Sequence, residues 1–125
     1  MDSTTKTYIA AVADVQIYAE QDCGFILTID IIQDSHIFEF GGSELFSAAQ
    51  CEGNPEYFLH FLSRCMYIGQ VCRLNDLIGT LIKIQLQDLS VTGIASLKGN
   101  EWFYPLTEFE SLKNEIVKDK NLRGE

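Results

Sequence analysis

The chain has 125 residues, of which 46% are hydrophobic and 22% charged, and its 18 acidic and 9 basic residues give a net charge of −9. This length and composition exclude a disordered chain and a chain with two separate cores. Affinity for nucleic acid depends mainly on lysine and arginine at phosphates, so the acidic balance argues against direct binding to DNA or RNA. We predict one domain over residues 1–125, with residues 1–6 and 118–125 frayed.

Three strands are predicted in the first third of the chain. Residues 8–20 alternate, with the odd-numbered residues from Ile9 to Ile17 on one side, and residues 25–33 are rich in aromatic and β-branched side chains. Asp34-Ser35 turns the chain into a third strand at residues 36–40. The short turns predict an antiparallel meander.

A glycine pair, Gly41-Gly42, follows the third strand. It lacks the further glycines and the lysine of a phosphate-binding loop, so we interpret it as a tight turn with positive φ. Asn54-Pro55 then supplies an N-cap residue and a proline at the first position of a helix that ends near Gly69. One face of this helix carries Phe58, Phe61, Leu62 and Cys65.

The second half of the chain predicts a helical turn or loop at residues 75–79, a hairpin of strands at 81–87 and 91–97, and a last helix. A capping box at Thr107 marks the start of that helix, which carries Phe109, Leu112 and Ile116. The order of three strands, helix, two strands and helix predicts an α+β fold. We expect a single curved antiparallel sheet of about five strands, with the helices on one face.

Three consecutive aromatic residues precede the last helix. In a strand or turn they cannot all point inward, and tyrosine and tryptophan are enriched in partner interfaces. We expect Trp102 and Phe103 to plug the core. For Tyr104 both the core and a partner interface stay open.

Motifs for catalysis or metal binding are not recognisable. The chain has two histidines, His36 and His60, and for His60 we expect a structural role on the helix surface. Its cysteines form no CxxC pair, and a zinc site built with His60 has no common spacing. We therefore predict a protein that is not an enzyme, with no cofactor and no metal. The cysteines, which we expect to be reduced, are Cys23, Cys51, Cys65 and Cys72.

The excess of negative charge lies in the first half of the chain. No lysine or arginine occurs between Lys6 and Arg64, whereas that stretch holds nine acidic residues. A surface of this kind repels nucleic acid and attracts a basic protein surface, which raises the association rate. A surface that serves only solubility is the plainer interpretation, and it stays open.

Five segments resemble a family of small phage and prophage proteins of unknown function. They are FGGSEL at 40–45, MYIG at 66–69, LNDLIGTLIKI at 74–84, VTGIASL at 91–97 and WFYP at 102–105. The chain departs from the family in having Leu74 where a tryptophan is usual, and in its acidic first half. The resemblance brings no catalytic residue and implies a phage-encoded accessory protein, a context in which inhibitors of host defence are frequent.

The leading hypothesis is a non-enzymatic binding protein of phage origin, such as an anti-CRISPR inhibitor, that covers a basic nucleic-acid channel of a host effector. No secretory signal or membrane span is recognisable, so we expect it in the cytoplasm of the host cell. The residues expected to contact the partner are Asp22, Asp30, Asp34, Glu39, Glu44 and Tyr104.

The alternative is a small-molecule binder that sequesters a signalling nucleotide in a pocket between protomers, near Tyr104 and the Gly41-Gly42 turn. A homodimer is compatible with the sequence and not required by it. Phosphate groups of such a ligand need cations, and the candidates are Arg64, Arg73 and Lys83. A hydrolase or nuclease is a third hypothesis, which no motif favours.

Overall fold

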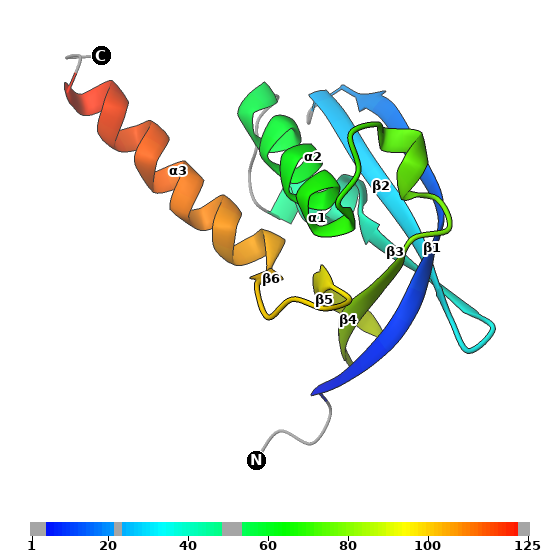
Figure 1. Cartoon of the computed structure of the whole chain (residues 1–125). Coiled ribbons are helices and arrows are strands. Elements are labelled where there is room, and N and C mark those ends of the chain that lie inside the picture. Colours follow the sequence, from blue (N-terminus) through cyan, green and yellow to red (C-terminus); the bar gives the residue numbers. More distant parts are fainter. Residues whose placement is uncertain (1–4, 22–23, 49–53, 123–125) are drawn as a thin grey trace.

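The computed structural model describes residues 5–21, 24–48 and 54–122 (Figure 1). Within these ranges the chain forms six strands, three α-helices and one short 3-10 helix. The elements are β1 (Thr5–Glu20), β2 (Gly24–Gln33), β3 (His36–Gly41), α1 (Gly42–Ala48), α2 (Pro55–Gly69), η1 (Leu74–Leu77), β4 (Leu81–Gln87), β5 (Ser90–Ser96), β6 (Trp102–Phe103) and α3 (Pro105–Leu122). None of the described helices is long and apolar enough to cross a membrane.

All six strands belong to one open antiparallel sheet in the order β3-β2-β1-β4-β5-β6, with α2 packed against one face. The predicted α+β fold is confirmed, with one strand more than expected because Trp102 and Phe103 pair with β5. The short helix α1 was not predicted, since seven residues are too few to show a helical period. Of the two terminal segments expected to fray, the first contributes to β1 from Thr5 onward and the second to α3 as far as Leu122.

The long strand β1 divides its length between two partners. Its residues 11–20 pair with β2, and its residues 5–11 pair with β4, so that Ala11 has a strand partner on both sides. The register with β2 shifts between Val12 and Asp14, close to this change of partner. Such a bulge bends the strand and increases its twist, which curls the sheet around α2.

The bulge also corrects the prediction that the odd-numbered residues of β1 share one face. Ala10 and Val12 are buried, whereas Ile9 is 62% exposed. Beyond the bulge the alternation is inverted, and Val15 packs against the core on the same face as Val12. One extra residue is enough to move every later side chain to the other face of a sheet.

Helix α2 begins and ends as its sequence predicts. The side chain of Asn54 accepts a hydrogen bond from the backbone N–H of Glu56 at 2.9 Å, and Pro55 occupies the first helical position. At the other end, Gln70 adopts the left-handed conformation with φ of 58°, and backbone N–H groups just past the helix bond to carbonyls of its last turn.

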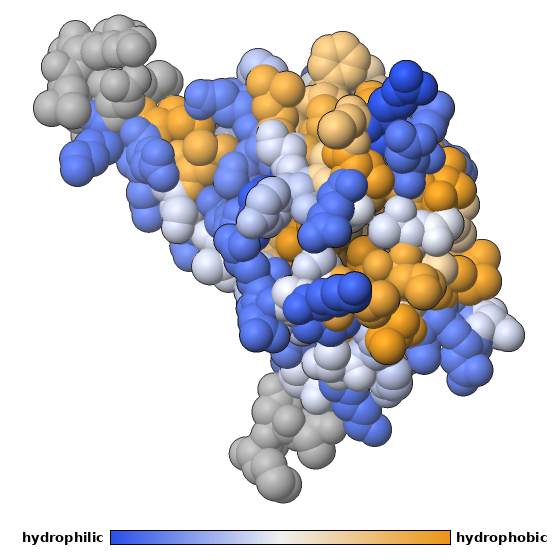
Figure 2. All heavy atoms as spheres, in the orientation of Figure 1, coloured by the Kyte–Doolittle hydropathy of each residue, from blue (hydrophilic) through white to orange (hydrophobic). Residues whose placement is uncertain are grey.

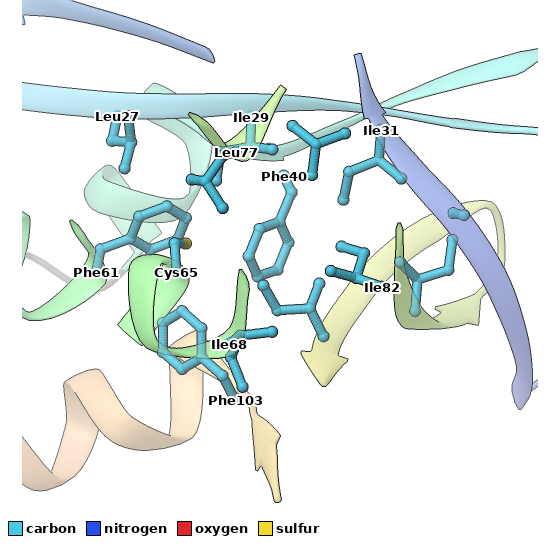
Figure 3. Close-up of a cluster of buried hydrophobic side chains, with 14 of the residues drawn as sticks. Leu27, Ile29, Ile31, Phe40, Phe61, Cys65, Ile68, Leu77, Ile82 and Phe103 are labelled. Atoms are coloured by element: carbon cyan, nitrogen blue, oxygen red, sulfur yellow. The ribbon is translucent and has the colours of Figure 1, made fainter. Parts of the chain in front are cut away.

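The core lies between α2 and the inner face of the sheet (Figure 3). The Phe61 ring of α2 lies 5.3 Å from the ring of Phe40, 5.7 Å from Phe46 and 5.5 Å from Phe103. Gly41 makes this contact feasible, because a Cβ atom there would lie 2.5 Å from the carbonyl oxygen of Leu27 and 2.7 Å from the Phe61 ring. The predicted positive φ of the Gly41-Gly42 turn is confirmed at 90° and 84°.

Helix α3 starts three residues earlier than predicted, at Pro105 and not after an N-cap at Thr107. Pro105 opens the helix, so Thr107 lies inside the first turn and the expected capping box is wrong. Phe109 anchors the first turns in the core, with Leu112 and Ile116 packed partly against it. Figure 1 shows the rest of α3 pointing away from the body of the domain.

Candidate partner-binding surface

Three carboxylates form a row across the outer face of the sheet, the face turned away from α2. Asp14 of β1 pairs directly with Asp30 of β2, and Asp30 pairs directly with Glu39 of β3. Side chains of directly opposite residues project to the same side of a sheet with Cβ atoms about 5 Å apart. We call Asp14, Asp30 and Glu39 the acidic row.

The acidic row is not neutralised from within the described part of the chain. The ion pairs found there join Glu108 to His60 and Arg64, and none reaches the row. Asp14 accepts a hydrogen bond from the amide of Gln16 at 3.3 Å. Like charges placed directly opposite each other destabilise a sheet, so the arrangement lowers stability without a compensating positive charge inside this part of the chain.

Apolar side chains form a second row beside the first, two residues from it on β2 and β3 and three residues from it on β1, where the bulge lies between. The pairings join Leu81 of β4 to Ala11, Ala11 to Ile32, and Ile32 to Ile37. Leu81, Ile32 and Ile37 are 52%, 38% and 66% exposed. We call these four residues the apolar row. Figure 2 shows apolar side chains gathered over the middle of β1.

A groove of about 570 Å³ opens between the edge strand β3 and the first half of β5. Here the curled sheet stops short of closing, because β3 and β5 come near each other without pairing in the described strand order. Helix α1 and the start of α3 complete its walls. The described lining residues include Glu39 and Glu44 and no lysine, arginine or histidine.

Tyr104 lies at the rim of this groove. Its ring stacks on Trp102 with centroids 5.9 Å apart and packs so closely on Gly93 that a Cβ atom there would lie 2.6 Å from it. Phe103 is fully buried and Trp102 half-buried, whereas Tyr104 is 36% exposed. Of the two alternatives left open for Tyr104, the structure places it at the surface.

The structure brings together some of the residues expected to contact a partner and separates others. Asp30 and Glu39 share the acidic row, and Glu39 also lines the groove with Glu44 and Tyr104. Asp34 lies in the β2–β3 turn, and Asp22 lies outside the described residues.

Asp14, the third member of the row, was not among the expected contacts. The two-residue turn at 34–35 gives the signal for one pairing, because Asp30 and Glu39 lie four residues on either side of it. The pairing of Asp14 depends in addition on the turn that joins β1 to β2.

The three cations proposed for a phosphate ligand do not gather at the groove. Arg64 bonds Glu108 through Nε at 3.1 Å and Nη2 at 3.3 Å, and Nη2 also donates to the carbonyl of Trp102. Lys83 donates to the carbonyl of Gly99 and lies over the Trp102 ring. Arg73 is exposed immediately before η1.

His60 and the described cysteines show no arrangement for catalysis or metal binding. His60 is half-buried, with Nε2 at 2.7 Å from Glu108 Oε1, so it links α2 to α3 together with Arg64. Burial raises the pKa of the Cys65 thiol well above 9.0, which keeps it protonated, whereas Cys72 is exposed. No three histidine, cysteine or carboxylate groups of the described residues come together as a metal site, and Cys51 lies outside those residues.

No protein-family model, no curated protein and no solved structure matches the chain. The resemblance to phage proteins therefore stays a prediction, and the geometry of this surface is what indicates a function.

Proposed function

We propose that this chain is a non-enzymatic binding protein that covers a basic surface of a partner protein with the outer face of its sheet. The observation that carries the proposal is the acidic row, in which Asp14, Asp30 and Glu39 lie directly opposite one another. A row of like charges lowers stability, and a basic partner turns that cost into binding energy.

Charge and hydrophobicity act together on this face. The acidic row attracts a basic surface over a distance of about one Debye length, roughly 8 Å at physiological salt. The apolar row beside it adds area that becomes buried on contact, through Ile32, Ile37 and Leu81. Charge therefore accelerates the encounter and the apolar row lengthens the lifetime of the complex.

A nucleic-acid-binding effector of a bacterial defence system is the partner that we propose. Its nucleic-acid channel is lined with lysine and arginine, so a row of carboxylates can occupy the place of phosphates there. The charge segregation of the first half and the resemblance to phage proteins both favour an inhibitor of anti-CRISPR type, acting in the cytoplasm of a host cell.

The test compares two double variants with the same change of net charge. Asp14→Lys with Asp30→Lys reverses the acidic row, and Glu110→Lys with Glu115→Lys alters exposed positions on α3. Each tagged variant is captured from bacterial cells under mild conditions and weighed by native mass spectrometry. We expect the original chain and the α3 variant to retain a basic protein at fixed stoichiometry, and the row variant to lose at least about 90% of it. If the row variant still retained the basic protein, the acidic row would not be part of the binding site.

A small-molecule binder remains a second candidate because of the groove. Its volume of about 570 Å³ falls in the range of ligand pockets, and Tyr104 offers a ring and a hydroxyl at its rim. Glu39 and Glu44 in its lining favour a neutral or cationic ligand over a signalling nucleotide. An extra mass of a few hundred daltons per protomer in the same spectra would support this candidate.

A further inference from the structure

The register of the β2–β3 hairpin shows which backbone groups of β3 point into the groove. The hairpin turns through two residues, Asp34 and Ser35, and its last pair is Gln33 with His36. A two-residue turn is closed by a hydrogen-bonded pair, and such pairs alternate with non-bonded ones along an antiparallel ladder. Ile37, Glu39 and Gly41 therefore turn their N–H and C=O groups away from β2, toward the groove.

The opposite wall has the same character. β4 and β5 also join through two residues, so Val91 belongs to a non-bonded pair and turns its backbone groups away from β4. Among the described strands, β5 pairs with β6 only at Ile94 and Ala95, and residues 90–93 have no strand on the side that faces away from β4. The groove is thus bordered by backbone from two strand edges, which is where an added strand forms its ladder.

The side chains around β3 define the sequence that an added strand would need. Glu39 projects to the outer face, so a basic side chain placed opposite it would continue the acidic row with an opposite charge. The neighbouring positions of that strand would face Phe38, Phe40 and Val91 in the groove, where apolar side chains fit. Glu44 adds a second carboxylate to the lining.

An exposed and strained leucine marks the mouth of the groove. Leu89 has a φ of 69°, a left-handed conformation that leucine rarely adopts, and 83% of it is exposed. The position suits glycine far better, since Asp-Gly is among the preferred sequences of such a turn. Ile37, on the other side of the mouth, is 66% exposed. Two apolar side chains are thus held in water on either side of the opening.

We propose that this groove binds an extended peptide segment of a partner protein, with alternating basic and apolar residues, as an added strand on β3. The charge of the lining selects a basic segment, and the unpaired edge selects an extended one. Glu39 alone shares this site with the acidic row, so the inference goes beyond the proposed function and can hold without it.

The probe is a fluorescein-labelled ten-residue peptide of alternating valine and lysine, titrated with the full chain in buffer at physiological salt. Its control has the same charges but carries N-methyl groups on all of its backbone amides, which removes the N–H donors from both edges of the strand and prevents strand pairing. We expect at least tenfold weaker binding of the N-methylated peptide, because the ladder with β3 is lost. Equal binding of the two peptides would show charge attraction alone and overturn the proposal.

A charge exchange locates the peptide on the protein. Glu39→Lys with Glu44→Lys should lower the affinity for the valine–lysine peptide at least tenfold. The same variant should bind a matched valine–glutamate peptide, and the original chain should not. Asp14→Lys with Asp30→Lys should change the affinity by less than about threefold, since neither residue lines the groove. If only this second variant lost its affinity for the valine–lysine peptide, the peptide would bind at the acidic row, and the assignment to the groove would be overturned.

The two hairpin turns supply a matched pair of variants. Leu89→Gly and Ser35→Gly both replace a residue at positive φ, so both should raise the melting temperature. Of these two residues only Leu89 lines the groove. Leu89→Gly should therefore lower the affinity for the peptide about threefold or more, whereas Ser35→Gly should leave the affinity unchanged. If both variants bound the peptide with equal affinity, Leu89 would not be part of the site, and this would contradict the proposal. A dimer of the original chain that Leu89→Gly dissociates would assign the groove to a second copy instead.

Discussion

On the inner face of the sheet, Ile29, Phe40 and Ile84 are at most 1% exposed, whereas the outer face of the same strands carries Asp30, Glu39 and a half-exposed Ile32. The inner residues are held by burial against α2, and their apolar character follows from that alone. The outer residues combine facing carboxylates with exposed isoleucines, and burial explains neither. The inner face therefore accounts for the fold, and the outer face for what the fold presents to a partner.

The largest effect is expected on the inner side, for Phe61→Ala. The Phe61 ring contacts four other aromatic rings and is fully buried, so its removal leaves a cavity. We expect a loss of about 3–5 kcal/mol in the free energy of unfolding, measured by chemical denaturation. A loss below about 1 kcal/mol would mean that the core does not depend on α2, which would break the comparison.

An effect of opposite sign is expected on the outer face, for Asp30→Asn. This change removes the central charge of the acidic row while keeping the size of the side chain, so repulsion from Asp14 and Glu39 disappears. We expect the free energy of unfolding to rise by about 0.2–1 kcal/mol at low salt and by less in salt.

The control for this change is Glu115→Gln on α3, which removes one exposed carboxylate outside the row. It should leave the free energy of unfolding nearly unchanged. Equal stabilisation by both variants would attribute the effect to net charge and not to the row.

The smallest effect is expected on the inner face, where Cys65 should change how the free energy of unfolding depends on pH. Burial raises the pKa of its thiol above the ordinary value of 9.0, so the folded chain holds this proton where the unfolded chain releases it. The stability that Cys65 contributes is complete below pH 9.0 and declines as the pH rises beyond it. Denaturation at several pH values should show a shallower decline for Cys65→Ala than for the original chain, and parallel curves would contradict the assignment.

Much of the inner face can be predicted from the sequence, because burial leaves a periodic pattern. Residues 81–87 alternate cleanly, and Ile82 and Ile84 point inward as expected. The pattern fails in β1, where the bulge after Val12 inverts the alternation. A bulge depends on how two strands meet, and no single residue of β1 announces it.

The candidate site is less predictable because it depends on contacts between distant segments. The sequence singles out Asp30, Glu39 and Glu44 by charge, but not that β3 and β5 approach each other and form a groove. That approach follows from the curl of the whole sheet. Leu89 carries a local signal, since a leucine after Asp88 stands where a hairpin turn prefers glycine.

The division of β1 between two partners also sets an order of events in folding. Its pairs with β2 join residues 4 to 21 positions apart, from Glu20 with Gly24 to Ala11 with Ile32. Its pairs with β4 join residues at least 70 positions apart, from Ala11 with Leu81 onward. Loops of that length close slowly, so the β1–β3 meander can form first, during synthesis, while the first half of β1 waits for β4. A chain whose synthesis stops before residue 81 leaves that half as an open edge available to other chains.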